Sequence, residues 1–257
     1  MPPILADRWR VVIVGGGAVG SSIAWHLATE KRFAGSVTVI ERDPTYARAS
    51  SALSASSIRQ QFSTALNIAL SQAGFRFLCE APERLAVEGD RPALGLRTPG
   101  YLFLASAEGL GVLRENLTVQ RAAGTGVALL AAFRRAARCL GVTYLAEEAV
   151  GFERIGARVN GVRLASGGTV GCDVVVNAAG PWSGQVAAWL GIDLPVRPRR
   201  RSVFVFACRE TLPGCPLVID PSGVWFRPIL VIRVPRSTFQ KRTRRAVIAL
   251  ANPDGSC

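Results

Sequence analysis

The sequence predicts an α/β fold in which helices cover a buried parallel sheet, and three observations lead to this prediction. Residues 11–14 are an uninterrupted run of valine and isoleucine, typical of a strand buried on both faces. A Gly-x-Gly-x-x-Gly motif at residues 15–20 leads directly into a helical pattern over residues 18–31. A second strand, residues 37–40, ends on Glu41. Strand, helix and strand in this order form the unit from which parallel sheets are built.

The three glycines of the motif have distinct physical roles. Gly15 permits a tight turn, Gly17 lets a pyrophosphate approach the backbone, and Gly20 lets the helix pack closely on the strand. The pyrophosphate then lies on free N–H groups at the positive end of the helix. Glu41 follows Gly20 by 21 residues, a spacing that suits a carboxylate accepting a ribose hydroxyl. The segment therefore predicts a dinucleotide-binding site.

Two other interpretations of this segment stay open from its residues alone. One is a glycine-rich turn in an ordinary α/β domain. The other is a signal peptide or membrane span, because residues 11–29 carry no charge and follow two arginines. Three consecutive glycines, Ser21, Ser22 and His26 interrupt that stretch and no small-residue cleavage site follows it, which argues against the membrane interpretation.

The composition is that of a globular protein. With 257 residues the chain is long enough for one large domain or two interleaved ones. Hydrophobic residues make up 49% of it, and the mean hydropathy is +0.26. The six cysteines form no Cys-x-x-Cys pair and there is one histidine, so we expect no metal site. Reduced thiols in the cytoplasm are the corresponding expectation.

The formal net charge is +13, which raises the question of a nucleic-acid partner. Six basic residues and one acid lie beyond residue 228, and four arginines cluster at residues 197–201. No recognition-helix or RNA-binding signature accompanies these charges. We therefore expect non-specific attraction of anions and no specific nucleic-acid binding.

The rest of the chain alternates between helical and strand patterns. Residues 47–57 form a loop rich in small and hydroxyl side chains, and Asn160-Gly161 is a hairpin-type turn signal. Helices are expected at residues 65–80, 107–122, 127–140 and 183–190. Strands are expected at residues 101–104, 142–145, 150–155, 159–165, 173–180, 196–206 and 223–227.

Two segments resemble the D-amino-acid-oxidase/glycine-oxidase (DAO) superfamily of FAD-dependent oxidoreductases. They are the N-terminal motif and residues 174–182, Val-Val-Val-Asn-Ala-Ala-Gly-Pro-Trp. Residues 41–46, 57–62 and 199–206 look like one group within it, the FAD-dependent oxidoreductase domain-containing protein 1 group with its bacterial relatives. The resemblance covers roughly residues 8–228. It implies a Rossmann-like FAD domain with a partial antiparallel β substrate domain interleaved in it.

The resemblance also implies which residues hold FAD. Arg42 would lie beside the adenine, and Ser50 and Ser51 match a loop that runs past the pyrophosphate toward the flavin. The backbone of Val150 would meet the adenine, and Ala179 and Gly180 would leave the cofactor room at the end of the strand. The implied cofactor-binding set is Gly15, Gly17, Ala18, Val19, Gly20, Glu41, Arg42, Ser50, Ser51, Val150, Ala179 and Gly180.

Some relatives attach flavin covalently through a histidine, and Leu53 stands at the best-matching position here. The single histidine, His26, lies within the first predicted helix and is expected to be a packed structural residue. The implied cofactor is therefore non-covalent FAD.

The chemistry implied is hydride transfer from the carbon beside an amine to flavin N5, which gives an imine that hydrolyses. An amine or N-methyl amino acid is the implied substrate, and its carboxylate requires a cation. Arg59 is the first candidate for that contact and Arg227 the second, with Tyr101 as a hydroxyl donor. A surface charge, a structural ion pair and a core tyrosine are the respective alternatives.

Two departures from the family complete the sequence picture. A segment is expected to be missing between residues 127 and 138, and residues 229–257 form an arginine-rich tail that fits no family element. We expect that tail to be truncated or frame-shifted; the alternative is a short variant whose basic tail contacts membrane lipid or a partner. The expected plan is residues 8–62 and 141–195 for the FAD domain, 63–140 for a shortened substrate segment, and 196–228 for partial substrate-domain strands.

The resemblance leaves three functions open. The first is an FAD-dependent amine or amino-acid oxidoreductase, incomplete in this form. The second is a flavin-binding scaffold or assembly factor, because animal members of the resembling group are associated with respiratory complex I assembly. The third is an inactive fragment.

Overall fold

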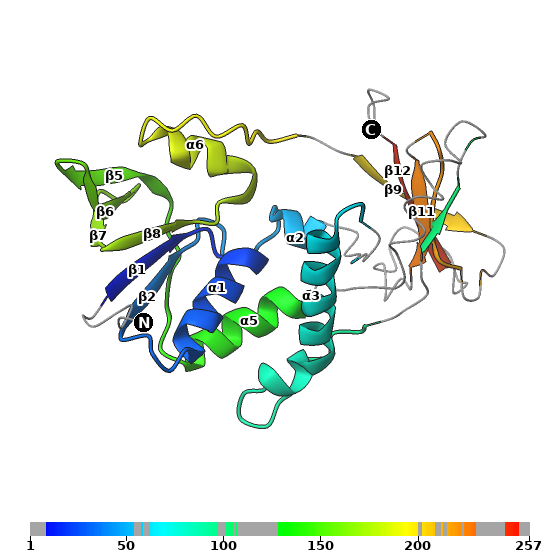
Figure 1. Ribbon diagram of the computed structural model, residues 1–257, viewed down its shortest axis with the longest axis horizontal. Coiled ribbons are helices and arrows are strands. Elements are labelled where there is room, and N and C mark those ends of the chain that lie inside the picture. The colour runs from blue at the N-terminus through cyan, green and yellow to red at the C-terminus, as the bar shows by residue number, and fades with distance from the viewer. Residues whose placement is uncertain are drawn as a thin grey trace, which may run out of the picture. The chain divides into compact units, whose positions relative to one another are not determined.

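The computed structural model of the chain contains two compact units, each made of segments that alternate along the sequence (Figure 1). The first comprises residues 1–56, 80–94 and 126–199, and the second comprises residues 57–79, 95–125 and 200–257. The structure describes residues 9–53, 58, 62–96, 101–104, 106, 128–199, 202–208, 212, 215–222, 224–229 and 245–251.

A four-stranded parallel sheet forms the centre of the first unit. Its order is β4 (Thr143–Leu145), β2 (Gly35–Ile40), β1 (Trp9–Val14) and β8 (Val174–Asn177). The run of valine and isoleucine in β1 is at most 6% exposed, as expected for a strand covered on both faces. The α/β class predicted from the sequence is confirmed.

Different elements cover the two faces of this sheet (Figure 1). Helix α1 (Ala18–Thr29) packs against α5 (Ala128–Cys139) on one side. On the other, a three-stranded antiparallel sheet of β5 (Ala149–Ile155), β6 (Arg158–Leu164) and β7 (Thr169–Gly171) packs with α6 (Ser183–Ala188). The core between them contains Val12, Val14, Ile40, Val162, Cys172 and Val186.

The turn of the β5–β6 hairpin differs from the prediction. Asn160 and Gly161 lie inside β6, and the turn falls at residues 156–157, where Gly156 has a φ of +59°. A Cβ on Gly161 would lie 2.6 Å from the Thr169 Cγ2, so this glycine permits close strand packing. The glycine that looked like part of a turn is therefore required for close packing within the sheet.

Two predicted boundaries also change. A short helix, α2 (Ser50–Leu53), interrupts the loop expected at residues 47–57. The helix expected at 65–80 extends as α3 (Ala65–Arg84), with Pro82 inside it. Helix α5 belongs to the first unit, whereas the expected plan counted its residues with the substrate segment. The helix expected at residues 107–122 lies outside the described residues.

The second unit contains a five-stranded sheet of order β3 (Tyr101–Phe103), β10 (Leu217–Ile219), β11 (Trp225–Ile229), β12 (Arg245–Ala251) and β9 (Ser202–Cys208). Strands β3 and β10 are parallel and the other neighbours are antiparallel. Strand β12 falls within residues 229–257, the tail that was expected to fit no family element. It pairs with both β9 and β11 and is therefore part of this sheet.

An ion-pair cluster joins the parallel sheet to the hairpin sheet. Arg10 donates from Nε and Nη2 to the two carboxylate oxygens of Asp173, each at 3.0 Å, and its backbone N–H donates to Oδ2 at 3.1 Å. Arg158 at the start of β6 lies 3.5 Å from the same carboxylate. These hydrogen bonds and charges lower the pKa of Asp173 to about 2. None of the described helices has an apolar stretch long enough to cross a membrane.

The depressed pKa predicts how the stability of the protein depends on pH. An unfolded aspartate titrates near about 3.9, so the Asp173 carboxylate stabilises the fold above that pH, and this stability is lost as the pH falls toward about 2. The variant Asp173→Asn should therefore melt at a lower temperature than wild type at pH 7 and at the same temperature near about pH 2.

Thermal unfolding followed by circular dichroism at a series of pH values measures this difference. Asp193→Asn is the matched control, because Asp193 is exposed and has no ion pair in the described part of the chain. A difference between Asp173→Asn and wild type that does not change with pH would contradict the assigned role.

Candidate functional site

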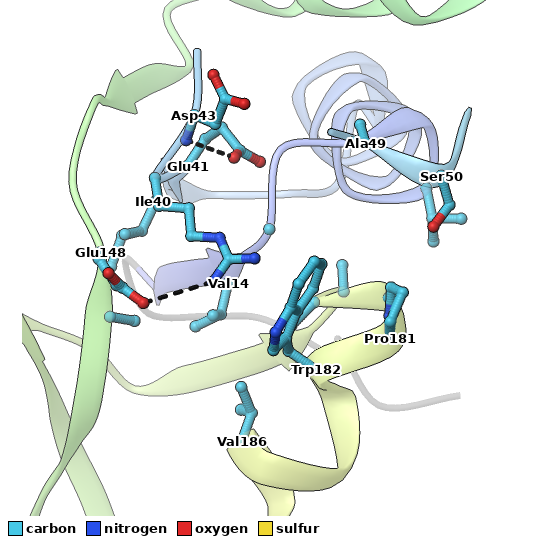
Figure 2. A pocket seen from close by; sticks show the side chains of 18 of the residues that line it. Val14, Ile40, Glu41, Asp43, Ala49, Ser50, Glu148, Pro181, Trp182 and Val186 are labelled. Carbon is cyan, nitrogen blue, oxygen red and sulfur yellow. Dashed lines mark hydrogen bonds and ion pairs between the residues drawn. The ribbon is translucent and has the colours of Figure 1, made fainter. Parts of the chain in front are cut away.

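A cavity of about 230 Å³ opens in the first unit at the carboxyl ends of β1, β2 and β8 (Figure 2). Hydrogen bonds continue the sheet just beyond the strands: the Gly15 N–H donates to the Ile40 carbonyl and the Ala178 N–H to the Val14 carbonyl, each at 2.9 Å. The chain segments that leave these strands therefore lie side by side around the cavity. Ligands of open α/β sheets bind at this edge.

The glycine-rich turn between β1 and α1 forms one wall of the cavity. A Cβ on Gly15, whose φ is +101°, would lie 2.4 Å from the Ala178 carbonyl oxygen. A Cβ on Gly20 would lie 1.9 Å from the Gly15 carbonyl oxygen, whereas one on Gly17 would have no atom within 4 Å. Gly15 and Gly20 are thus required for packing inside the protein. Gly17 leaves open space on the cavity side.

The amino end of α1 supplies hydrogen-bond donors to this wall. Gly17, the N-cap residue, has no capping side chain, and Gly17, Ala18 and Val19 all line the cavity. The first N–H groups of a helix have no partner within the helix and carry its positive dipole end. The wall therefore suits an anion such as a pyrophosphate.

The Glu41 carboxylate lies beside the turn and is held by two backbone groups. Its Oε1 accepts the Asp43 N–H at 2.8 Å (Figure 2). Its Oε2 accepts the Gly16 N–H, also at 2.8 Å. A carboxylate offers about four acceptor sites, so each oxygen keeps one for a ligand. The arrangement fixes an acceptor pair in the cavity, as binding of ribose hydroxyls requires.

Arg42 crosses the cavity to the segment that follows β8. Its guanidinium lies 3.8 Å from the centre of the Trp182 ring, and Nη1 lies 3.5 Å from Glu148 Oε1 (Figure 2). Trp182 belongs to the 3-10 turn η1 (Gly180–Trp182), whose Gly180 has a φ of +56°. A cation on an aromatic face links the two sides of the cavity here.

Most of the cofactor-binding residues expected from the sequence lie together in this cavity. The expected residues that line it are Gly15, Gly17, Ala18, Val19, Glu41, Arg42, Ser50, Ser51, Ala179 and Gly180. Gly20 and Val150 do not: Gly20 lies behind the turn, and the neighbours of Val150, Glu148 and Ala149, line the cavity in its place.

Sequence reasoning missed several lining residues, including Tyr46, Arg48, Gln185 and Trp189. Trp182 also lines the cavity and was not predicted to do so, although its place at the end of the Ala-Ala-Gly-Pro-Trp segment was a local signal for it. The others reach the cavity through tertiary packing.

Two of the three candidates for a substrate carboxylate, Arg227 and Tyr101, do not line this cavity. Arg227 and Tyr101 are in β11 and β3 of the second unit, on either side of β10, and Tyr101 is close enough to raise the pKa of Arg227. Burial is the larger effect and lowers that pKa. Arg59 lies outside the described residues.

Neither His26 nor any cysteine of the described residues lines the cavity. His26 was expected to be packed inside the protein, but it is exposed. Its ring lies edge-on to Trp25 at 4.8 Å between ring centres, and its Nδ1 is 2.8 Å from the Ser22 carbonyl oxygen. Leu53 is 63% exposed at the end of α2. Within the described residues, no group of three or more histidine, cysteine, aspartate or glutamate side chains could hold a metal ion.

Comparison with known proteins identifies the family. A model of the FAD dependent oxidoreductase family (DAO) matches residues 10–127 and 123–244. The chain belongs to the DAO family of FAD-dependent oxidoreductases. The match continues past residue 228, where the resemblance was expected to end.

One DAO relative is FAD-dependent oxidoreductase domain-containing protein 1 of Xenopus laevis, 38% identical over 297 positions that cover 88% of this chain and 59% of the frog protein. The chain therefore spans about three fifths of the length of that relative. The 297 aligned positions exceed the 257 residues of the chain, so within the match the frog protein carries residues that this chain lacks.

Solved DAO-like structures share the fold. L-proline dehydrogenase from P. horikoshii has a TM-score of 0.72 and 21% identity, covering 96% of this chain and 71% of that one. Glycine oxidase from Bacillus cereus has a TM-score of 0.71 and 18% identity, covering 95% and 72% respectively.

The contrast between Gly17 and Gly20 gives a prediction that separates binding from folding. The variant Gly17→Ala should keep the melting temperature of wild type, because its methyl group enters open space. Its affinity for FAD should fall at least about tenfold, because that space is where a pyrophosphate would approach the backbone.

The variant Gly20→Ala should instead lower the melting temperature by about 5–10 °C, because its methyl group meets the Gly15 carbonyl. Differential scanning calorimetry and titration with FAD measure both properties. Equal melting temperatures for the two variants would contradict the assigned roles.

Proposed function

We propose that this chain binds FAD non-covalently in the cavity of its first unit and oxidises the C–N bond of an amino acid or related amine. One observation carries the cofactor part of the proposal. The glycine-rich turn leaves open space at Gly17 beside the amino end of α1, while backbone hydrogen bonds hold Glu41 next to that turn. Together they offer donors for a pyrophosphate and acceptors for a ribose.

Each wall of the cavity has a part in this proposal. The N–H groups of Gly17 and the first turn of α1 would hold the pyrophosphate, and Glu41 would accept the ribose hydroxyls. Ser50 and Ser51 leave a lining with little side-chain bulk, and Gly180 lacks a side chain, so the cofactor can pass along both.

Attachment is proposed to be non-covalent because the lining residues include no histidine or cysteine. Leu53, at the position where some relatives carry the attaching histidine, has no nucleophilic atom. His26 lies on α1 and is not among the lining residues. Among the described residues around this cavity there is therefore no imidazole or thiol to form the covalent bond.

When bound, FAD would accept the hydride from the substrate carbon beside nitrogen. The protein's own contribution is to orient the substrate and exclude water. Arg227 is proposed to bind the substrate carboxylate and Tyr101 to donate a hydrogen bond to it, because both lie in the same sheet of the second unit. The names of the solved relatives, L-proline dehydrogenase and glycine oxidase, support amino acids as the substrate class.

Anaerobic reduction of the flavin tests this function. Protein loaded with FAD is mixed with sarcosine, glycine or L-proline, and bleaching of the visible flavin absorbance is followed. The proposal expects bleaching with at least one of these compounds. A flavin that stays oxidised with all of them while dithionite reduces it would contradict the oxidase part and favour a flavin-binding scaffold.

Replacement of Arg227 tests the proposed carboxylate contact. Arg227→Gln should lower kcat/KM for an amino acid by about 10- to 100-fold, because a charged hydrogen bond to the carboxylate is lost. The corresponding amine without a carboxylate should react equally with both proteins. An equal loss for the two substrates in steady-state assays would contradict the contact.

A further inference from the structure

Tyr46 is the buried polar side chain of the cavity that the proposed function does not use. It lies in the connection after β2 with a φ of +57°, a conformation that is uncommon for a residue with a side chain. Two backbone hydrogen bonds hold it there: its N–H donates to the Asp43 carbonyl at 2.9 Å, and its carbonyl accepts the Ala49 N–H at 3.0 Å. The side chain lines the cavity and is only 8% exposed.

The Tyr46 hydroxyl lies against the middle of the glycine-rich turn. A Cβ placed on Gly16 would be 3.1 Å from this hydroxyl and 3.0 Å from the Glu41 Cβ. The same glycine donates its N–H to Glu41, and its carbonyl accepts the Ser21 hydroxyl at 2.7 Å. The tyrosine hydroxyl is therefore packed against the glycine-rich turn and Glu41, and Tyr46 lines the cavity on the side where the adenosine half of a dinucleotide would lie.

This hydroxyl has no hydrogen-bond partner among the described residues. Leaving a buried donor unpaired is unfavourable, and native structures almost always supply a partner. Burial also raises the pKa of Tyr46 to about 12, so the group stays protonated and remains a donor at neutral pH. The missing partner is thus an acceptor that the described residues do not provide.

Arg134 of α5 holds the tyrosine ring in place. Its guanidinium carbon lies 5.2 Å from the centre of the Tyr46 ring and 5.5 Å from that of Tyr144 in β4. Its Nη1 donates to the Pro44 carbonyl at 3.1 Å, two residues before Tyr46. The Tyr144 hydroxyl is also buried, but it lies beside the Ser21 side chain, and Tyr144 does not line the cavity.

We propose that Tyr46 is a further cofactor-binding residue, whose hydroxyl donates a hydrogen bond to the ADP half of the bound dinucleotide. Arg134 is a positioning residue that holds the Tyr46 ring through its contact with the ring face and with Pro44. This inference rests on the proposed binding of FAD in the same cavity. It adds a donor from the connection after β2 to the acceptor pair of Glu41.

The variant Tyr46→Phe tests the proposal, because it removes one oxygen and keeps the ring. Its affinities for FAD and for ADP-ribose should both fall by about three- to tenfold, since the lost hydrogen bond lies in the half that the two ligands share. The melting temperature of the cofactor-free protein should not fall, because the removed hydroxyl has no partner there. Isothermal titration and calorimetry measure these quantities.

Tyr144→Phe is the matched control. It removes a buried hydroxyl beside the same arginine, but outside the cavity, so both ligands should bind as they do to wild type. Arg134→Lys should weaken ADP-ribose binding in the wild-type background and have a smaller effect in the Tyr46→Phe background, because its contribution passes through that hydroxyl.

The outcomes separate this inference from the proposed function. If wild type binds neither FAD nor ADP-ribose, the proposed function fails and this inference fails with it. If wild type binds both and Tyr46→Phe binds them equally well, only the inference is overturned. A loss of affinity accompanied by a lower melting temperature of the cofactor-free protein would also overturn it, since the hydroxyl would then act on the fold.

Discussion

The site depends on one backbone contact, in which the start of α1 lies directly on the glycine-rich turn. At Gly20 the helix comes so close to the Gly15 carbonyl that any side chain would overlap it. This contact sets the position of the helix relative to the end of β1, and therefore the position of its unpaired N–H groups in the cavity. The other partner of the contact, the Gly15 carbonyl, directly follows β1 and is held in place by the buried parallel strands. Packing inside the protein thus determines where an anion can be held.

The second constraint is the set of hydrogen bonds that joins the turn to the connection after β2. Glu41 accepts from Gly16 and from Asp43, while Ser21 donates to Gly16, so one glycine is fixed at both its N–H and its carbonyl. Arg42 then links this connection to Trp182 on the opposite side of the cavity. The cavity walls come from distant parts of the sequence, yet each is tied to the others by contacts within one unit.

Local chemistry explains what the sequence could predict. Strand β1, the glycines and Glu41 were predicted because apolar runs and glycine spacing act over a few residues, and the structure brings them together. Tyr46 could not be predicted, since its place depends on Arg134, 88 residues further along the chain. The Asn-Gly pair at residues 160–161 led to a wrong turn prediction for a related reason. Tight packing against β7 requires a glycine at residue 161, and the sequence alone does not distinguish such a glycine from one in a turn.

The most direct test of the central claim, that this cavity holds non-covalent FAD, is a visible absorption spectrum of the purified protein before and after acid precipitation. The account predicts a flavin spectrum that passes entirely into the supernatant, because the lining residues offer hydrogen bonds and include no histidine or cysteine. Flavin that remained in the pellet would contradict non-covalent binding. A colourless, folded protein that does not take up added FAD would contradict the claim altogether.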